Sequence, residues 1–375
     1  MRIVIFFNFL KEAGLMLYKK FFSSRLLDWN FNKNTRQMPW KGEKDPYKIW
    51  ISEIILQQTR VQQGLAYYYR FIKAFPDIKI LALASEKKIY KLWQGLGYYS
   101  RCKNLIATAR YIHEELNNQF PKEFEDILSL KGIGPYTASA IASFAFNRPY
   151  AVLDGNVFRV LSRFFGIKIP INTSAGKKYY GELAQILLDK INPANYNQAI
   201  MDFGAVICKP AIPLCAECPL QQRCVAFLTG RVSLLPINEK VVKQKKRYFN
   251  YLIVEYDQKF YLRKRIQKDI WQNLFEFILI ETDSLTDENE FFKHKEFQSC
   301  FETSEFIVFH VSKIFCQKLT HQLINGKFFH IRISVPLINA KEYEIFSEKQ
   351  FKKLPFPKLI ASYLADKNVS LNLFE

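Results

Sequence analysis

Residues Leu130–Ala138 read LKGIGPYTA, a short turn with two glycines that separates two stretches of helical periodicity. Gly132 and Gly134 can both adopt positive φ angles, which residues with a side chain rarely do. Such a turn leaves backbone N–H groups exposed where the next helix begins, and N–H groups in that position bind phosphate. An ordinary helical turn with a glycine C-cap accounts for the same residues equally well. The turn therefore predicts helices on both sides and leaves phosphate binding open.

On both sides of this turn the chain has a helical pattern, from Asp45 to about Asn192, with apolar residues three or four positions apart. Residues 230–247 lack this period and contain a basic run, so we interpret them as a linker. Aromatic and β-branched runs beyond the linker predict strands. The predicted strands are Tyr248–Tyr256, Phe260–Arg265, Phe275–Ile280 and Phe328–Val335, and a last helix is predicted over Pro357–Ala365. The pattern indicates a mainly helical region followed by a smaller α+β domain.

Residues 1–16 read MRIVIFFNFLKEAGLM, which begins like a signal sequence. The apolar stretch Ile3–Leu10 is short, Lys11 and Glu12 come directly after it, and no small-residue cleavage site is visible. We therefore interpret residues 1–16 as a leader without function or as the product of a start codon assigned too early, with Met16 as the true start. No later stretch is apolar enough to span a membrane, so no membrane partner is expected.

The chain has 375 residues and a formal net charge of +19, from 54 Lys and Arg against 35 Asp and Glu. An enzyme of small neutral metabolites does not need such a field, whereas a protein that binds a polyanion does. A bias in base composition also enriches lysine, so the charge alone defines no site. The seven cysteines are an odd number, which argues against a complete disulfide framework and favours reduced thiols or metal ligands in the cytoplasm.

Four of the cysteines are spaced as Cys-x6-Cys-x2-Cys-x5-Cys, within seventeen residues. They are Cys208, Cys215, Cys218 and Cys224. A loop of this kind can surround one compact metal centre, and four thiols without histidine suit either tetrahedral zinc or a cubane iron–sulfur cluster. The spacing does not distinguish the two. The other three cysteines, Cys102, Cys300 and Cys316, share no ligand spacing and are interpreted as structural thiols.

The segment Asp45–Thr59 reads DPYKIWISEIILQQT and predicts a helix with Asp45 as its N-cap and Pro46 at its first position. Glu53 lies among apolar neighbours in this helix. Burial there should raise its pKa and keep a proton available near neutral pH, as a general acid requires. A solvated or locally paired glutamate on a polar stripe is the alternative.

The segment Leu153–Val157 reads LDGNV and precedes the helical run Phe158–Phe165. Asp154 is expected to cap that helix. Because helix-terminal N–H groups favour the charged form of a carboxyl, we expect a lowered pKa for Asp154. Glu53 and Asp154 would then form an acid and an anion with separated pKa values. Cleavage of a glycosidic bond through an oxocarbenium-like transition state uses such a pair.

Taken together, these motifs resemble the adenine-specific DNA glycosylases of the helix-hairpin-helix superfamily, the MutY type. The resemblance extends from Arg36 to Cys224. It rests on Met38–Trp40, Pro46–Trp50, Ser52–Glu53, Gln57–Thr59, Gly95–Tyr99, Gly132–Gly134, Leu153–Val157 and the four cysteines. It implies a six-helix barrel domain, one 4Fe-4S cluster held by the four cysteines, and an active site between the barrel and the cluster domain.

The resemblance also implies roles for individual residues. Glu53 looks like the acid that protonates N7 of a flipped adenine, and Asp154 like the carboxylate that stabilises the sugar cation. Asn156 and Tyr136 resemble supporting groups of the active site. Residues that contact the DNA or the lesion are implied at Gln58 and Tyr98 (wedge residues), Thr59 and Leu96 (contacts to the orphan 8-oxoguanine), Gly132 and Gly134 (hairpin), and Arg36 (a basic position).

Relatives of the endonuclease III type carry a lysine nucleophile where this chain has Tyr136. A tyrosine cannot form the Schiff base that opens the sugar ring, so we expect a monofunctional glycosylase with at most weak strand cleavage. Lys131 stands where the family usually has proline, a departure that concerns the rigidity of the hairpin and its phosphate contacts.

The region after the linker resembles, more weakly, the Nudix-like recognition domain of the same family. Phe260–Arg265 and Ile270–Phe277 fit its early strands, and Leu319–Gln322 could be the loop that reads 8-oxoguanine, through Thr320 and His321. The alternative is that both are ordinary loop residues. The glutamate-rich metal-binding helix of Nudix hydrolases is missing, so this domain is expected to bind nucleotides rather than hydrolyse them.

The resulting prediction is a base-excision-repair adenine glycosylase acting on double-stranded DNA with A:8-oxoG or A:G mispairs, as a cytoplasmic monomer, nucleoid-associated in a bacterium. Its expected parts are a leader (1–16), the glycosylase region with the cluster loop 208–224 (17–229), the linker (230–247) and the Nudix-like domain (248–375). A DNA-binding protein without catalysis, which would need neither Glu53 nor Asp154, is the alternative from another class.

Overall fold

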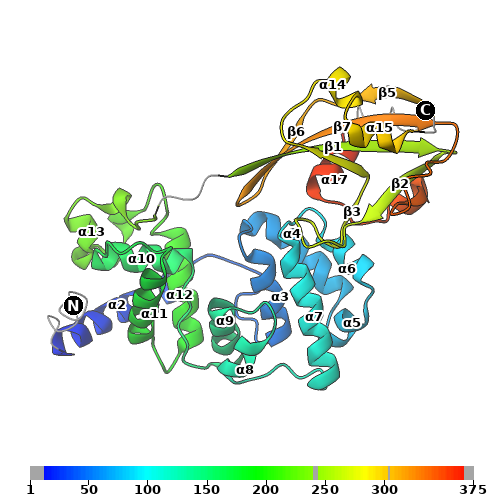
Figure 1. The fold of residues 1–375 in the computed structure, drawn as a ribbon. Helices are drawn as coiled ribbons and strands as arrows, with labels where there is room; N and C mark the ends of the chain where they lie inside the picture. Colours follow the sequence, from blue (N-terminus) through cyan, green and yellow to red (C-terminus); the bar gives the residue numbers. More distant parts are fainter. Residues whose placement is uncertain (1–11, 240–243, 303–304, 367–375) are drawn as a thin grey trace. The chain divides into compact units, whose positions relative to one another are not determined.

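The computed structural model describes residues 12–239, 244–302 and 305–366. These residues form two compact units (Figure 1). The first takes in the chain up to Val61, Phe75–Lys79 and Ala107–Lys240, and the second takes in Gln62–Ala74, Ile80–Ile106 and the chain from Val241 onward. The helical stretch 62–74 and 80–106 thus groups with the C-terminal part, whereas the boundaries expected from sequence placed it with the glycosylase region.

The first unit is helical. Its helices are α2 (Glu12–Asn32), α3 (Pro46–Leu56), α8 (Phe124–Ser129), α9 (Pro135–Phe146), α10 (Gly155–Phe165), α11 (Ser174–Leu187), α12 (Pro193–Val206), α13 (Val225–Leu228), η1 (Cys215–Glu217), η2 (Gln221–Arg223) and η3 (Val232–Leu234). Two helices, α5 (Ile78–Leu83) and α7 (Tyr99–Glu115), run through both units. The helical pattern expected up to about Asn192 is confirmed, and α12 extends it.

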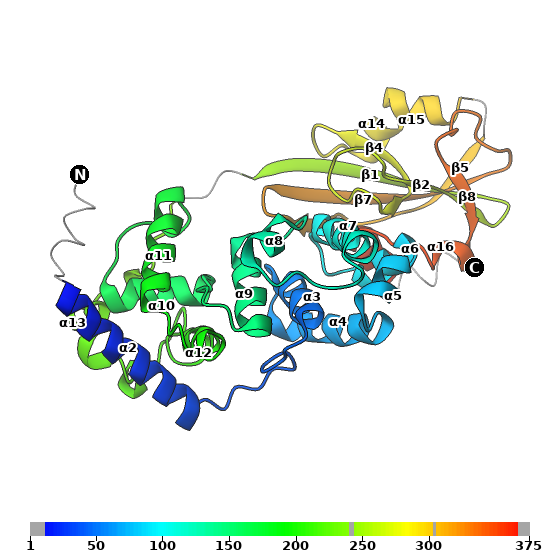
Figure 2. The ribbon, with the colours of Figure 1, turned by 90° about the horizontal axis from the view of Figure 1, so that it is seen from below.

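Helix α10 is the centre of one hydrophobic core. Its buried apolar residues recur at the three- and four-residue spacing of an amphipathic helix: Val157, Val160, Leu161 and Phe164. They pack with α2, which runs alongside α10 and α12 in Figure 2, and the ring of Phe164 lies 4.9 Å from that of Phe22. Gly166 ends α10 at φ +67°, and a Cβ there would lie 2.5 Å from a methyl group of Val225, so only glycine fits.

The second unit combines α4 (Val61–Ala74) and α6 (Glu86–Trp93) with an eight-stranded mixed sheet and short helices. The strands are β1 (Lys245–Tyr256), β2 (Lys259–Lys264), β3 (Phe275–Glu276), β4 (Ile278–Thr282), β5 (Phe306–Val311), β6 (Phe315–Lys318), β7 (Gln322–Ile333) and β8 (Glu344–Ser347). The main order is β3-β2-β1-β7-β5, with β1 and β7 parallel and the other strand pairs of the described residues antiparallel.

Helices cover both faces of this sheet. Neighbouring residues of a strand point to opposite faces, so two adjacent residues of β7 contact different helices. Phe329 of β7 stacks on Phe291 of α14 (Glu288–Phe292), which lies beside α15 (Lys295–Cys300) (Figures 1 and 2). Phe328, one position earlier, stacks on Tyr363 of α17 (Lys358–Leu364) with 3.8 Å between ring centroids. The remaining short helix, α16 (Glu348–Phe351), follows β8.

Several expected elements change at their ends. The predicted strand Phe275–Ile280 is two strands, β3 paired with β2 and β4 paired with β1, so the chain changes partner between them. The strand expected over Phe328–Val335 begins earlier, at Gln322, and ends at Ile333. Strand β1 begins at Lys245, inside the expected linker, because its backbone pairs with β7. The last helix is confirmed, with Pro357 as N-cap and Ala365 as C-cap.

The expected leader, residues 1–16, overlaps α2, which begins at Glu12, and its first eleven residues lie outside the described part of the chain. Within the described residues, every helix is too short or too polar to cross a bilayer.

Candidate active site

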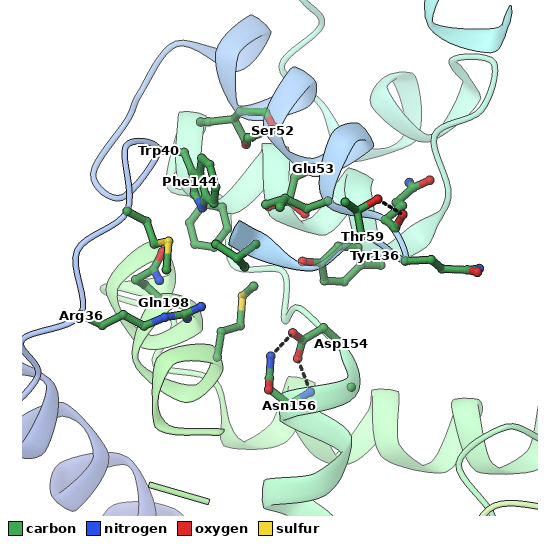
Figure 3. Close-up of a pocket in the computed structure, with 18 residues that line it drawn as sticks. Arg36, Trp40, Ser52, Glu53, Thr59, Tyr136, Phe144, Asp154, Asn156 and Gln198 are labelled. Carbon is green, nitrogen blue, oxygen red and sulfur yellow. Dashed lines mark hydrogen bonds between the residues drawn. The ribbon is translucent and has the colours of Figure 1, made fainter. Parts of the chain in front are cut away.

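A pocket of about 490 Å³ opens in the first unit (Figure 3). It collects most of the residues that the sequence predicted for the active site of that unit. The predicted residues in its wall are Arg36, Glu53, Gln58, Thr59, Tyr136, Asp154 and Asn156. Other residues of the wall are Met38, Trp40, Ile49, Ser52, Leu56, Gln57, Val61, Phe144, Gly155, Gln198 and Met201. The wall is thus built by α3, α9, α10 and α12 and by the segments directly before and after α3.

Helix α3 places Glu53 in this wall. Asp45 caps the helix by accepting a hydrogen bond from the Tyr47 N–H at 2.9 Å, with Pro46 at the first position, as predicted. Nearly all of α3 is apolar and buried, and the residue Glu53 is only 7 % exposed. Burial is the main cause that raises the pKa of Glu53 to about 7; the charge of Asp154 raises it further, and the Tyr136 hydroxyl lowers it. The expectation of a raised pKa is confirmed.

Tyr136, the second residue of α9, lies between the two carboxyl groups in Figure 3. Burial, followed by the charges of Glu53 and Asp154, raises its pKa well above the usual value. Its hydroxyl therefore stays protonated at neutral pH and can donate to the carboxyl of Glu53.

Asp154 caps α10, as predicted. Its Oδ1 accepts hydrogen bonds from the backbone N–H groups of Asn156 (2.9 Å) and Val157 (2.8 Å), and its Oδ2 accepts from Asn156 Nδ2 (2.7 Å). The expected lowering of its pKa is wrong. Burial raises the pKa of Asp154 and outweighs these three hydrogen bonds and the nearby charge of Arg159. The cap is visible in the sequence, but the depth of burial depends on the other walls of the pocket.

Asn156 connects the pocket to the cysteine loop through Arg159. Asn156 Oδ1 accepts from Arg159 Nη2 at 2.8 Å, and the same guanidinium donates to the carbonyls of Cys208 (2.7 Å) and Gly204 (2.7 Å). Helix α12 passes so close that a Cβ on Gly204 would lie 2.6 Å from Asn156 Cβ. The side chain of Asn156 is therefore held by Arg159 on one side and by helix α12 on the other.

The four cysteines of the predicted cluster loop gather at one place. Cys208, Cys218 and Cys224 pack against the core around α10, and Arg163 donates to Cys208 Sγ at 3.5 Å. Burial raises the pKa of Cys218 to about 12, with smaller contributions from the three other thiols of the loop, which are near enough to interact. Among the described residues, no group of three or more His, Cys, Asp or Glu side chains is placed so that it could hold a metal ion.

The other predicted contacts of the first unit lie as follows. Arg36 donates from Nη1 to Asp202 Oδ1 at 2.6 Å, and Asp202 is fully buried. Gln58 adopts a φ of +54°, which is uncommon for a residue with a side chain. In the hairpin, Gly132 takes φ +82°, whereas Gly134 is the extended N-cap of α9 at φ −96°.

The predicted lesion contacts of the second unit share one region. Tyr98 adopts φ +50° and is 43 % exposed, and its hydroxyl lies 3.1 Å from Thr320 Oγ1. Leu96 is buried, in the same turn between α6 and α7. His321 is exposed, and its carbonyl accepts from the Lys245 N–H at 3.0 Å.

The residues of the pocket wall to which sequence reasoning gave no role include Trp40, Gln198 and Met201. Trp40 belongs to the motif Met38–Trp40, which by itself indicates no role for the side chain. Gln198 and Met201 lie three positions apart on α12, a spacing that puts them on one helix face, yet nothing local shows that this face meets α3 and α10.

The chain is similar to known DNA glycosylases in sequence and in structure. Residues 51–186 match the family model of the HhH-GPD superfamily base excision DNA repair proteins. The adenine DNA glycosylase of Buchnera aphidicola subsp. Schizaphis graminum is 36 % identical over 317 residues, which cover 82 % of this chain and 88 % of that protein. The adenine DNA glycosylase of Mus musculus is 40 % identical over 227 residues, which cover 57 % of this chain and 44 % of that protein.

A solved thermostable thymine-DNA glycosylase superposes with a TM-score of 0.52 at 30 % identity, over 56 % of this chain and 97 % of its own. The likeness to the Buchnera protein spans most of both chains. The chain therefore belongs to the adenine DNA glycosylases of the HhH-GPD superfamily of base excision DNA repair proteins.

Proposed function

We propose that this protein removes adenine paired with 8-oxoguanine or guanine from double-stranded DNA, by hydrolysis of the N-glycosidic bond. One observation carries the proposal: Glu53, with a pKa of about 7, shares a buried pocket with Asp154. A neutral carboxyl can donate a proton to the leaving base, and a second carboxylate can stabilise positive charge on the sugar. A non-catalytic DNA-binding protein would have no use for this pair.

We propose the following course for the reaction. The adenine is flipped out of the duplex into the pocket, and Glu53 donates its proton to N7 of the base. The C1′–N9 bond then breaks, its electron pair leaves with the base, and the Asp154 carboxylate faces the cationic sugar. Water adds to C1′ and loses a proton to a carboxylate of the pair. The Tyr136 hydroxyl donates a hydrogen bond to the carboxyl of Glu53 and so orients this acid.

The pocket also supports a monofunctional enzyme. Strand cleavage by this superfamily's lyases needs an amine that forms a Schiff base with the sugar. Among the described residues that line the pocket, none is a lysine, and Tyr136 holds the position implied for the nucleophile.

We also propose one 4Fe-4S cluster at Cys208, Cys215, Cys218 and Cys224. The four-thiol donor set fits this group, because iron–sulfur clusters take thiolate ligands. Backbone N–H groups of Leu220 and Phe227 interact with the sulfurs of Cys218 and Cys224, as N–H groups around such clusters do. When bound, the cluster cross-links the loop; it takes no part in the steps above.

In functional terms, we propose that residues 17–229 form the glycosylase region and that residues 248–375, joined through 230–247, form a Nudix-like domain that reads 8-oxoguanine through Thr320 and His321. The charge of +19 and the hairpin at Gly132 and Gly134 favour DNA as the partner of a monomer in the cytoplasm. Thr59 and Leu96 would contact the orphan base, and the wedge residues Gln58 and Tyr98 would fill the space that the flipped adenine leaves in the duplex.

The test is adenine release under single-turnover conditions from duplexes with adenine opposite 8-oxoguanine, guanine or thymine. Wild-type protein should release adenine fastest opposite 8-oxoguanine, and Glu53→Gln, which keeps the shape of the side chain but has no acidic proton, should lose release by a factor of at least about 100. Unchanged release by Glu53→Gln would remove Glu53 from the mechanism. Efficient borohydride trapping of wild-type protein on DNA would overturn the monofunctional assignment.

A further inference from the structure

The loop Gln94–Tyr99 between α6 and α7 is tightly braced inside the second unit. Gly95 and Gly97 have φ angles of +91° and +82°, and a Cβ on Gly95 would lie 2.7 Å from the hydroxyl of Tyr67. That hydroxyl donates to the Gln94 carbonyl at 2.8 Å. The loop therefore has one packed conformation, from which Tyr98 projects at a positive φ.

A segment near the C-terminus, Lys352–Phe356, binds α6 and α7 on either side of this loop through alternate backbone carbonyls. The Leu354 carbonyl accepts from Lys91 Nζ of α6 at 3.0 Å, and the Phe356 carbonyl accepts from the Tyr99 hydroxyl of α7 at 3.4 Å. The Pro355 carbonyl between them accepts from the Phe275 N–H of β3 at 2.9 Å. The alternation is that of an extended chain, with one side bound to the helices and the other to the sheet.

Lys91 makes two of the contacts with this segment. Its ammonium donates to two carbonyls, that of Leu354 and that of Lys352, the latter at 2.7 Å. Lys91 is half-buried, and burial lowers its pKa, so its charge has been partly removed from water. A desolvated ammonium that binds two carbonyls fixes their geometry more firmly than a solvated surface lysine does.

Other contacts in the same unit connect α6 and α7 to the sheet. Asn273 Nδ2 donates to the Tyr90 hydroxyl at 3.1 Å, and Lys103 Nζ donates to Gln272 Oε1 at 3.0 Å. The hydroxyl of Tyr98 meets Thr320 Oγ1 at 3.1 Å. The loop that bears Tyr98 and the loop that bears Thr320 are thus parts of one packed body.

We propose that Lys91 is a positioning residue for mispair selection: through the carbonyls of Lys352 and Leu354 it fixes the Gln94–Tyr99 loop, and with it Tyr98, on the C-terminal sheet. The inference rests on the proposed function, because it assumes that Tyr98 fills the space left in the duplex and that Thr320 reads the base opposite adenine. Loss of the hydrogen bonds from Lys91 to the two carbonyls should let Tyr98 and Thr320 move independently. Selection would then suffer while the chemistry in the pocket, to which Lys91 contributes no atom, remains intact.

The test compares Lys91→Met with two controls in the full-length protein. Methionine keeps the length and apolar packing of lysine but donates no hydrogen bond, whereas Lys91→Arg keeps donors for the carbonyls. Lys87→Met removes the same charge from an exposed position of the same helix. Adenine release would be measured opposite 8-oxoguanine and opposite guanine, and 2-aminopurine beside the orphan base would report insertion of the Tyr98 ring by its fluorescence.

Lys91→Met should lower the preference for 8-oxoguanine over guanine by about tenfold, the scale of a lost charge-assisted hydrogen bond, with the rate opposite guanine nearly unchanged. The fluorescence change on binding should shrink with it, and Lys91→Arg and Lys87→Met should behave as wild type. An unaltered preference, or an equal fall of both rates, would overturn the proposal.

If Lys91→Met does not fold, Tyr99→Phe removes the other contact to the segment and must show the same loss of preference. The proposed function is judged separately by the wild-type arm. If wild-type protein releases no adenine, the proposed function is refuted. If wild-type protein and Lys91→Met both release adenine with the same preference for 8-oxoguanine, only the role proposed for Lys91 is refuted.

Discussion

The carboxyl of Glu53 is buried in an apolar helix, and its pKa of about 7 makes both activity and stability depend on pH. The acid form is the one that donates a proton, so the single-turnover rate of adenine release should fall as the pH rises through about 7. Because the folded pKa exceeds the unfolded one, the contribution of Glu53 to stability is complete below about pH 4.5 and is lost as the pH rises through about 7.

Glu53→Gln should therefore be more stable than wild type at alkaline pH. The difference between about 7 and 4.5, at about 1.4 kcal/mol for each pH unit, corresponds to about 3 kcal/mol. Urea denaturation at about pH 5 and at about pH 8 would measure it. An equal effect of the substitution on the free energy of unfolding at both pH values would contradict the raised pKa.

Gly204 is a second residue on which the site depends. A methyl group there would meet Asn156 Cβ at 2.6 Å, so Gly204→Ala must displace Asn156 and the hydrogen bond it gives to Asp154. We expect adenine release to fall by about tenfold to a hundredfold, the cost of a displacement of about 1 Å in an active site. Gly181→Ala in α11 is the control, because the nearest atom to its Cβ is 4.0 Å away. Equal rates for the two variants would exclude this packing role.

Among the elements, α10 combines support and chemistry. Its N-cap is Asp154, its apolar face lies in the core, and its C-cap is Gly166. Asparagine caps a helix about as well as aspartate does, so Asp154→Asn should separate the two roles. We expect little change in melting temperature and a fall in adenine release of about a hundredfold or more, because the neutral amide cannot stabilise the sugar cation.

One result would contradict the prediction for Asp154→Asn. If Asp154→Asn lowered the melting temperature as much as Asp154→Ala, which loses the cap at a cost of about 1 kcal/mol, the carboxylate would be structural. The comparison needs both variants, with thermal unfolding and single-turnover release measured on each.

Across the molecule, signals within one element were readable from sequence. The helices α3 and α10 could be predicted from their N-caps, Asp45 and Asp154, and α10 also from the apolar spacing of Val157–Phe164. The raised pKa of Glu53 could be predicted from its apolar neighbours in the sequence. Properties that depend on packing between distant segments were not readable. The pKa direction of Asp154 depends on walls that come from α3 and α9, and Gln198 reaches the pocket only because α12 packs on α10.

The strands of the sheet also depend on packing between distant segments, so their bounds could not be predicted from the sequence. The division of Phe275–Ile280 into β3 and β4 depends on which neighbour each pairs with, and β5, β6 and β8 are short or partly exposed strands without a clear period. The grouping of Ile80–Ile106 with the sheet arises from contacts such as that of Lys91 with Leu354, more than 260 residues apart. No local pattern encodes such a contact.

The net charge of +19 acts on binding rather than on the chemistry. Each phosphate neutralised by lysine or arginine releases counterions, so the Kd for duplex DNA should rise by about a thousandfold between about 50 mM and about 200 mM salt if roughly six phosphates are contacted. The single-turnover rate at saturating protein should change by less than about twofold, because Glu53 and Asp154 act in a buried pocket where salt screens little. Fluorescence anisotropy with Glu53→Gln, which binds without cleaving, would give the Kd, and a rate constant as salt-dependent as the Kd would mean that the charges also act in the chemical step.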